Sequence, residues 1–218
     1  MALKGLDREV VTDAIVSSVV PEGNFNLTTL CKRYFECDPM FIGEDDCDLG
    51  IEALIDRPDQ VGADRLVNTV AVHGRYEGAL IVVDFGTATT FDVVDEDGNY
   101  RGGVICPGIN LSLDALYMAA AQLPRVDIRA TTSIIGKATV PAMQSGIFWG
   151  YIGMIEGLVE RIRGEFGAKM TVVATGGLAP LFAEATNVID HVYPDMTLRG
   201  LVEVYKRTVS YTHLTLPT

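Results

Sequence analysis

The nine residues Asp84-Phe-Gly-Thr-Ala-Thr-Thr-Phe-Asp92 decide how the fold of this chain is interpreted. The aliphatic run at 79–83 predicts a buried strand, and strand-like composition resumes at 89–94. Gly86, between the two runs, permits a tight turn because a glycine backbone has few steric limits. The stretch therefore predicts a hairpin whose first strand ends in a carboxylate.

The chemistry of this hairpin favours a nucleotide phosphate. Gly86 lets backbone N–H groups approach an anion closely, and the hydroxyl groups of Thr87 and Thr89 add donors. Asp84 can hold a cation or a water molecule against phosphate oxygens. Together these parts predict phosphoryl transfer, although an ordinary hairpin turn has a similar composition.

The bulk composition is that of a globular protein. With 218 residues, of which 48% are apolar, the chain can bury a substantial core. Its formal charge is −12 and it has no run of Lys or Arg, so it lacks the basic surface that binds nucleic acid or anionic lipid. No stretch reaches the roughly 18 consecutive apolar residues of a membrane span, and the N-terminus does not resemble a signal peptide. We therefore expect a cytoplasmic protein with no nucleic-acid or membrane partner.

The cysteine and histidine residues predict no metal or redox site. The four cysteines are too widely spaced for a Cys-x-x-Cys motif, and the three histidines form no His-Glu-x-x-His motif. We expect reduced thiols and structural histidines.

Hydrophobic periodicity and turn residues predict a β-α-β beginning, then a second unit in which three strands precede a helix. The expected strands are 13–20, 39–42, 79–84, 88–95, 100–105, 170–174 and 188–192. The expected helices are 25–35, 62–76, 108–122, 138–166, a short helix ending near 185, and 197–207. Residues 209–218 lack the acidity and periodicity of the sequence before them, so we expect a tail that is non-native or disordered.

Five blocks of sequence resemble a known family. The blocks are Ser17-Ser-Val-Val-Pro21, Val61-Gly-Ala-Asp-Arg-Leu-Val-Asn68, Asp84 to Asp92, Gly102-Gly-Val-Ile-Cys-Pro-Gly108 and Gly176-Gly-Leu-Ala179. In this order and at this spacing, they resemble the type III pantothenate kinases, of the superfamily that contains acetate kinase, sugar kinases and actin. The resemblance extends over nearly the whole chain, from about residue 11 to residue 207.

The resemblance implies an α/β fold of two ribonuclease-H-like lobes, as in actin-like ATPases. We expect residues 1–77 to form the remainder of the first lobe with the interlobe helix, and residues 78–208 to form the second lobe, which binds nucleotide and substrate. Family members open with a strand ending in Asp-x-Gly-Asn-Thr, the first phosphate loop, and this sequence lacks that motif. We therefore expect an incomplete first lobe and an N-terminally truncated chain.

The resemblance also implies an activity. Type III pantothenate kinases are cytoplasmic homodimers that transfer the γ-phosphoryl group of ATP to the hydroxyl of pantothenate. The product, 4'-phosphopantothenate, completes the first step of coenzyme A biosynthesis. The implied cofactors are ATP, Mg²⁺ and a monovalent cation, K⁺ or NH₄⁺.

Matching the motifs residue by residue gives candidate site residues. Asp64 corresponds to the family's catalytic base, and the motif Gly62-Ala63-Asp64-Arg65 lines the pantothenate pocket. Asp84 corresponds to the ligand of the monovalent cation, Thr87 to an ATP contact, and Thr139 to a substrate contact.

The phosphate turn and a glycine pair complete the candidate nucleotide site. Gly86 lies in the phosphate turn, and Gly176 and Gly177 follow a predicted strand, where they let a helix N-terminus approach a flat ligand. In this superfamily that ligand is the adenosine part of ATP, although a plain strand-to-helix turn would look similar. We expect Asp64 and Asp84 to act on the same migrating phosphoryl group.

Other interpretations stay open at this point. An isolated Asp64 in the first turn of a helix would be explained by the helix dipole alone, which favours a carboxylate there by about 0.3–1 kcal/mol. The chain can also be a non-catalytic regulatory or accessory binding protein of the same family. A kinase acting on acetate or a sugar is disfavoured by Gly62-Ala63-Asp64-Arg65.

A stripe of glycines marks the long predicted helix. Gly146, Gly150, Gly153 and Gly157 share one helical face, and each costs about 1 kcal/mol relative to alanine. Close packing against this face would offset that cost. We expect the stripe to pack either against its own lobe or against a second subunit.

Overall fold

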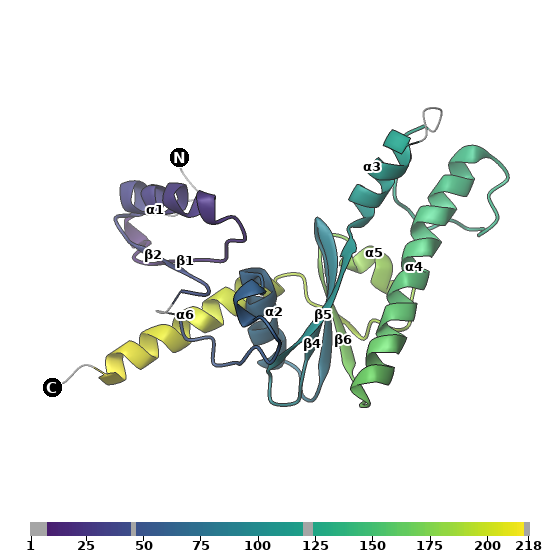
Figure 1. Ribbon diagram of the computed structural model, residues 1–218. Coiled ribbons are helices and arrows are strands. Elements are labelled where there is room, and N and C mark those ends of the chain that lie inside the picture. The colour runs from purple at the N-terminus through teal and green to yellow at the C-terminus, as the bar shows by residue number, and fades with distance from the viewer. Residues whose placement is uncertain (1–7, 45–46, 120–123, 216–218) are drawn as a thin grey trace. The chain divides into compact units, whose positions relative to one another are not determined.

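A computed structural model of the chain describes residues 8–44, 47–119 and 124–215 (Figure 1). It has a mixed α/β fold, as the sequence predicts. The described residues fall into two compact units. The first unit combines the residues up to Arg75 with those from Met196 onward, and the second is Tyr76–Asp195.

The second unit is built on a five-stranded sheet. Its strands are β3 (Leu80–Phe85), β4 (Ala88–Val94), β5 (Tyr100–Pro107), β6 (Thr171–Gly176) and β7 (His191–Val192). Their order is β5-β4-β3-β6-β7. β4 runs antiparallel to both of its neighbours, whereas β3, β6 and β7 are parallel. The predicted hairpin is confirmed, because β3 and β4 pair on either side of a two-residue turn.

Helices cover one face of this sheet. The unit contains α3 (Ile109–Ala119), α4 (Thr139–Phe166) and α5 (Ala179–Ala183), and α4 lies alongside the sheet with α5 (Figure 1). Alternate residues of a strand point to the same face, so Ile81, Val83 and Phe85 all enter the core beneath α4 and α5. The Phe85 and Phe182 rings stack there at 4.9 Å. The predicted long helix is confirmed, while the predicted end of α3 at residue 122 lies outside the described residues.

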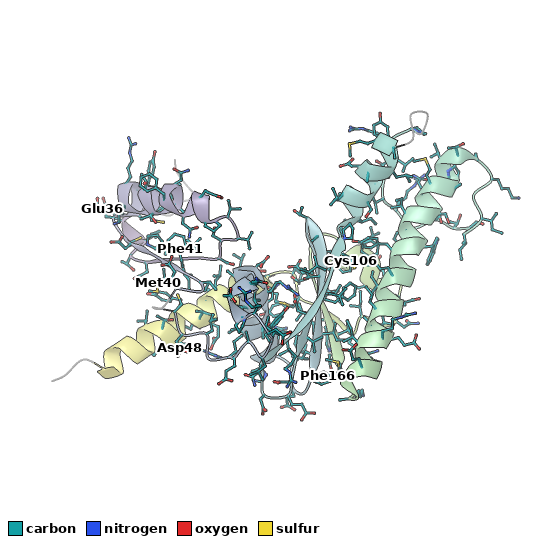
Figure 2. All side chains as sticks on the ribbon, viewed as in Figure 1. Glu36, Met40, Phe41, Asp48, Cys106 and Phe166 are labelled. Carbon is teal, nitrogen blue, oxygen red and sulfur yellow. The ribbon has the colours of Figure 1, made fainter. Side chains whose placement is uncertain are left out.

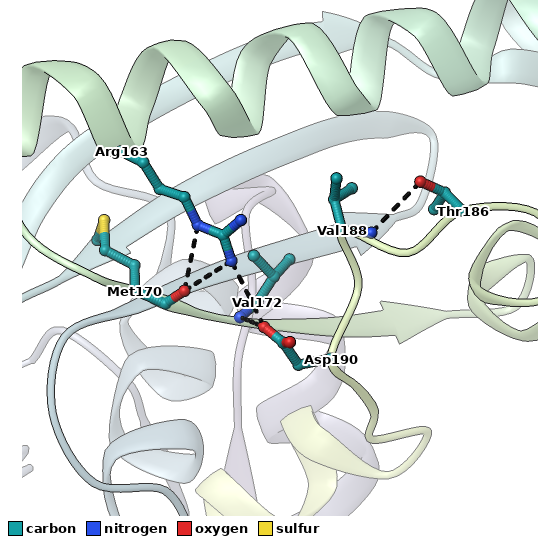
Figure 3. Close-up of polar contacts among 6 residues, drawn as sticks. All are labelled: Arg163, Met170, Val172, Thr186, Val188 and Asp190. Carbon is teal, nitrogen blue, oxygen red and sulfur yellow. Dashed lines mark hydrogen bonds and ion pairs between the residues drawn. The ribbon is translucent and has the colours of Figure 1, made fainter.

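A polar cluster fixes the end of α4 to the start of β6 and β7 (Figure 3). The Arg163 guanidinium donates two hydrogen bonds, at 3.2 and 2.7 Å, to the carbonyl of Met170. It also lies 3.5 Å from Oδ2 of Asp190, and that oxygen accepts the Val172 N–H at 2.8 Å. Because the Asp190 N–H donates to the Val172 carbonyl, Asp190 bonds both backbone groups of one β6 residue.

The first unit begins with the predicted β-α-β motif. After a short 3₁₀ turn, Arg8–Val10, strand β1 (Ala14–Val16) pairs in parallel with β2 (Pro39–Phe41), and α1 (Pro21–Phe35) connects them. The expected start of this helix at residue 25 is wrong: α1 starts at Pro21, whose fixed φ suits the first position of a helix. The helix ends at Phe35 and is followed by Glu36 in the left-handed conformation. Phe41, at the end of β2, is buried. Figure 2 labels both Glu36 and Phe41.

Two helices complete the first unit. A 3₁₀ turn, Pro58–Gln60, precedes α2 (Ala63–His73), which packs against α6 (Met196–Thr215). Their shared core contains Val67 and Val70 of α2 and Val204 of α6. α6 thus differs from its expected place in two ways: it belongs to the first unit rather than to residues 78–208, and it continues past Arg207 to Thr215. No helix in the described part of the chain is long and apolar enough to cross a membrane.

Candidate functional site

The turn between β3 and β4 is an exposed backbone loop at one end of the sheet. Gly86 and Thr87 are both exposed to solvent. The Gly86 N–H donates to the carbonyl of Ala88 at 3.0 Å, which closes the turn. The Thr87 carbonyl accepts the N–H of Gly108 at 3.2 Å, so the residue that follows β5 supports the turn from the side.

Gly108 packs directly on the turn. A Cβ atom placed on Gly108 would lie 2.2 Å from the carbonyl oxygen of Thr87 and 2.8 Å from that of Gly86. Both neighbours are backbone atoms, which cannot move aside as a flexible side chain can. Only glycine fits at position 108, and the sequence analysis placed it in a matching block without giving it a role.

Gly176 and Gly177 lie at the same end of the sheet. Gly176 pairs with Phe85 across β3 and β6. Its φ of +90° and the 2.6 Å that would separate a Cβ from the Phe85 carbonyl oxygen both require glycine. Gly177 is exposed, and no atom in the described part of the chain lies within 4 Å of a Cβ built on it. The structure thus brings the two glycines and the Gly86–Thr87 turn together at the carboxyl ends of two parallel strands.

Asp84 is half-buried one residue before the end of β3. Since Val83 and Phe85 face the α4 side, Asp84 faces the opposite side of the sheet. Its Oδ1 lies 3.9 Å from where a Cβ on Gly86 would stand, so the carboxylate is beside the turn. The described residues include no group of three or more His, Cys, Asp or Glu that could hold a metal ion. A cation at Asp84 would therefore take further oxygen ligands from backbone carbonyls, water or a phosphate.

Thr89 is not placed as the sequence analysis expected. The expectation that its hydroxyl serves the turn is wrong, because Thr89 shares the α4 side of β4 with Phe91 and Val93 and is 1% exposed. Its Oγ1 lies 2.6 Å from the hydroxyl oxygen of Tyr151 on α4. Thr87 is the threonine of this pair that remains accessible at the turn.

Asp64 lies in the first unit, in the first turn of α2. Its Oδ1 accepts the N–H of Arg65 at 2.9 Å, which is a favourable position for a carboxylate at a helix N-terminus. A Cβ on Gly62 would stand 2.6 Å from the same oxygen and 3.6 Å from Cγ1 of Val19. Ala63 is buried. Two of the sequence blocks, at 17–21 and 61–68, therefore meet around this carboxylate.

Thr139 is the exposed first residue of α4. The loop before it is tied to the helix by two side chains: the buried Ser145 donates to the carbonyl of Ile134, and the half-buried Trp149 indole donates to Thr131 at 2.9 Å. The loop and the helix line a cavity of about 590 Å³ that is open to solvent. Its polar lining includes Arg129, Thr131, Thr132, Ser133, Lys137 and Gln144. The sequence pattern alone predicted no role for these residues.

The candidate residues thus form three groups in the structure. Asp84, the turn and the glycine pair gather at one end of the sheet. Thr139 lies apart from this first group. It comes twelve residues before Tyr151, the residue that contacts Thr89, which is about 18 Å along α4 at 1.5 Å per residue. Gly62 to Arg65 belong to the other unit, so the expectation that Asp64 and Asp84 share a phosphoryl group stays a prediction.

Comparison with known proteins identifies the family. A family model described as type III pantothenate kinase matches residues 1–161. A type III pantothenate kinase of Paramagnetospirillum magneticum is 64% identical over 207 residues, which is 95% of this chain and 80% of the relative. The chain belongs to the type III pantothenate kinase family. The type III pantothenate kinase of Rhodospirillum rubrum is 63% identical, with the same coverage of both chains.

A solved structure supports the fold. The chain is similar to a Campylobacter jejuni protein assigned to the Baf family of transcriptional activators, with a TM-score of 0.66 over 91% of this chain and 84% of that one. Because the two sequences are only 16% identical, this likeness concerns the fold of the chain alone.

Proposed function

We propose that this chain transfers the γ-phosphoryl group of ATP to the hydroxyl of pantothenate, the first step of coenzyme A biosynthesis. One observation carries the proposal: an exposed Gly86–Thr87 turn, with the Asp84 carboxylate beside it, in a member of this kinase family. Exposed backbone N–H groups and a nearby carboxylate suit phosphates accompanied by a cation.

The second unit would bind the nucleotide. Thr87 and the backbone of Gly86 would contact the phosphates, and Gly177 has open space above its α-carbon for the adenosine. Gly176 has a packing role against Phe85 that accounts for it without a ligand. Asp84 would hold a monovalent cation, K⁺ or NH₄⁺. With Mg²⁺, that cation supplies positive charge to neutralise the phosphates.

The first unit would supply the base. Phosphoryl transfer through a loose transition state needs alignment of two oxygens and charge neutralisation more than a strong base. A carboxylate such as Asp64 suffices to accept the hydroxyl proton of pantothenate late in the reaction. Gly62, Ala63 and Arg65 would line the acceptor pocket, with Arg65 positioned to bind the substrate carboxylate or the transferred group. Thr139 would be a further substrate contact.

The architecture we propose is a ribonuclease-H-like second lobe. Its support is the five-stranded sheet. In the β3-β4-β5 meander, the middle strand β4 runs antiparallel to β3, and on the other edge of β3 the strands β6 and β7 continue the sheet in parallel. The first unit would be the remainder of a similar lobe, because it has two parallel strands, β1 and β2, joined by α1. A cytoplasmic location would follow from the activity.

A homodimer would explain the exposed apolar surface of the second unit. Large apolar side chains stand exposed on α3, on the loop before α4 and on the first turn of α4. They are Leu111, Leu116, Tyr117, Met118, Ile134, Ile135 and Val140. Gly146, Gly150 and Gly153 of the α4 stripe add a smooth exposed face, and a second subunit could cover both surfaces.

The alternative function is a non-catalytic accessory protein of the same family. This chain shares its fold with a protein assigned to the Baf transcriptional activators, so the fold alone is compatible with this second function. The presence of Asp64, Asp84 and Thr87 favours the enzyme, because a binding protein has no need of this chemistry.

Replacing Asp64 tests the enzyme directly. We expect wild-type chain to form phosphopantothenate from ATP and pantothenate, and Asp64→Asn to reduce kcat by about 10²- to 10⁴-fold, the usual contribution of a general base. Asp59→Asn is the matched control, because Asp59 is an exposed carboxylate of the same unit. Full activity of Asp64→Asn would contradict its role as base. An inactive wild-type chain that captures a protein target would favour the accessory function.

A further inference from the structure

The hydroxyl of Tyr151 connects α4 to β4 and β5, next to the Gly86–Thr87 turn. It donates to the carbonyl of Pro107, at the end of β5, at 2.8 Å. It also lies 2.6 Å from Oγ1 of Thr89, on β4. A tyrosine hydroxyl can donate one hydrogen bond, and here the Pro107 carbonyl accepts it. Thr89 must therefore donate to Tyr151, which gives a directed chain from Thr89 through Tyr151 to Pro107.

Both side chains of this hydrogen-bonded chain are buried. Thr89 is 1% exposed and Tyr151 is 7% exposed. Burial raises the pKa of the Tyr151 hydroxyl, so the group stays protonated and keeps its donor role through the neutral range. Since buried polar groups are costly when unpaired, the three partners hold one another in place.

The two ends of this hydrogen-bonded chain, Thr89 and Pro107, lie close in sequence to the residues that form and support the turn. Thr89 follows Thr87 by two residues along β4. Pro107 immediately precedes Gly108, whose N–H bonds the Thr87 carbonyl and whose α-carbon packs on the turn. A shift of either strand relative to α4 would therefore move the Gly86–Thr87 backbone.

We propose that Tyr151 is a positioning residue for phosphoryl transfer, which fixes the Gly86–Thr87 turn in the geometry that receives the nucleotide phosphates. The inference rests on the proposed function, because it concerns the ATP site. Tyr151 would not touch the nucleotide itself. It acts through Thr89 on one side of the turn and through Pro107 and Gly108 on the other.

The variant Tyr151→Phe isolates the hydroxyl. The Tyr151 ring packs against Phe182, with ring centroids 5.3 Å apart, and a phenylalanine would keep this contact. We expect the affinity for ATP, measured by calorimetry, to fall about tenfold on loss of this paired buried group. The KM for ATP should rise by the same factor, while the KM for pantothenate stays within twofold. Amide exchange at residues 85–90 should quicken in the nucleotide-free protein.

Two controls separate positioning from general stability. Ile155→Val removes one methyl group from a fully buried residue one helical turn further along α4, so it should lower the melting temperature without weakening ATP binding. Thr89→Ser keeps a hydroxyl at the start of the chain and should bind ATP as wild type does, whereas Thr89→Val should match Tyr151→Phe. This pair also provides the test if Tyr151→Phe does not fold.

The outcomes distinguish the two proposals. If wild type binds ATP and both Tyr151→Phe and Thr89→Val bind it equally well, the positioning role is overturned and the kinase assignment stands. Equal loss of affinity in Ile155→Val would also overturn it, because stability alone would then explain the effect. If wild type binds no ATP, the proposed function fails, and with it the positioning role that depends on it.

Discussion

At the scale of single residues, the close contact between Gly62 and Asp64 bears most directly on the proposed chemistry. The carboxylate folds back over the helix N-terminus, and its Oδ1 occupies the space that a side chain at position 62 would need. This explains why a glycine precedes Ala63-Asp64-Arg65 without appeal to turn conformation, since the φ of Gly62 is an ordinary −60°. The glycine sets where the proposed base can stand.

The variant Gly62→Ala should therefore displace the base without removing it. A Cβ 2.6 Å from Oδ1 would push the carboxylate away from the Arg65 N–H. A misplacement of about 1 Å can cost about 10²-fold in rate, so we expect kcat to fall by about that factor while the protein stays folded. Steady-state kinetics with circular dichroism would check both parts.

The matched control is Gly74→Ala at the other end of α2. A Cβ there would meet the Val70 carbonyl oxygen at a tolerable 3.4 Å. We expect this variant to keep wild-type kcat. Equal kinetics in both glycine variants would mean that the position of the Asp64 carboxylate does not limit the rate.

At the scale of helices and strands, local pattern predicted the elements and missed their contacts. The β3-β4 hairpin, α4 and the opening β-α-β motif follow from the period of apolar residues along short stretches, so sequence was enough. The start of α1 was missed because Pro21 suits both a turn and a first helical residue.

The same distinction applies to the candidate site. Asp84, Gly86 and Gly176 meet because strand ends of a parallel pair share an edge, which the sequence pattern contains. The contact of Thr89 with Tyr151 spans 62 residues, and no local signal marks it. Strand alternation alone would have placed Thr89 on the buried side with Phe91. The packing of α6 on α2 is similarly non-local and was not predicted.

The Arg163 cluster gives a stability prediction at this scale. Arg163→Met removes two hydrogen bonds to the Met170 carbonyl and the contact with Asp190, while keeping an apolar stem of similar length. We expect the free energy of unfolding to fall by about 1–2 kcal/mol, since the bonds involve a charged donor on a partly exposed side chain. Urea denaturation would measure this loss.

Arg163→Lys and Asp190→Asn provide the comparison. Lysine is a single point donor and cannot reproduce the two-nitrogen bond, so its loss should be intermediate. Asparagine keeps an oxygen for the Val172 N–H and should cost less than Arg163→Met. If all three variants match wild type, the cluster contributes nothing measurable to stability.

At the scale of the whole molecule, the glycine stripe of α4 raises the question of assembly. The first expected alternative, packing against its own lobe, is not found for three of the four glycines: a Cβ on Gly146, Gly150 or Gly153 would meet no atom of the described residues within 4 Å. Gly157 is half-buried, and Nη1 of Arg161 on the same helix would lie 3.0 Å from its Cβ. A second subunit remains the proposed partner for this face. A larger side chain at position 150 should therefore leave the folding of a single chain unaffected and disrupt an oligomer.

We expect Gly150→Leu to reduce the mass measured by light scattering from dimer to monomer. Gly150→Ala is its control, because both variants remove the glycine from the helix and only leucine adds bulk. Neither should destabilise the folded chain, and alanine should stabilise it by up to about 1 kcal/mol. A wild-type mass for Gly150→Leu would exclude this face from the interface.

The division of the first unit between the two ends of the sequence has a consequence for how the protein is made. Translation releases α2 from the ribosome long before α6, with the entire second unit synthesised between them. Until then, Val67 and Val70 lack the helix that shares their core, whereas the continuous second unit can close its sheet during elongation. The second unit can thus mature first, and the segment before it must wait until α6 has been synthesised.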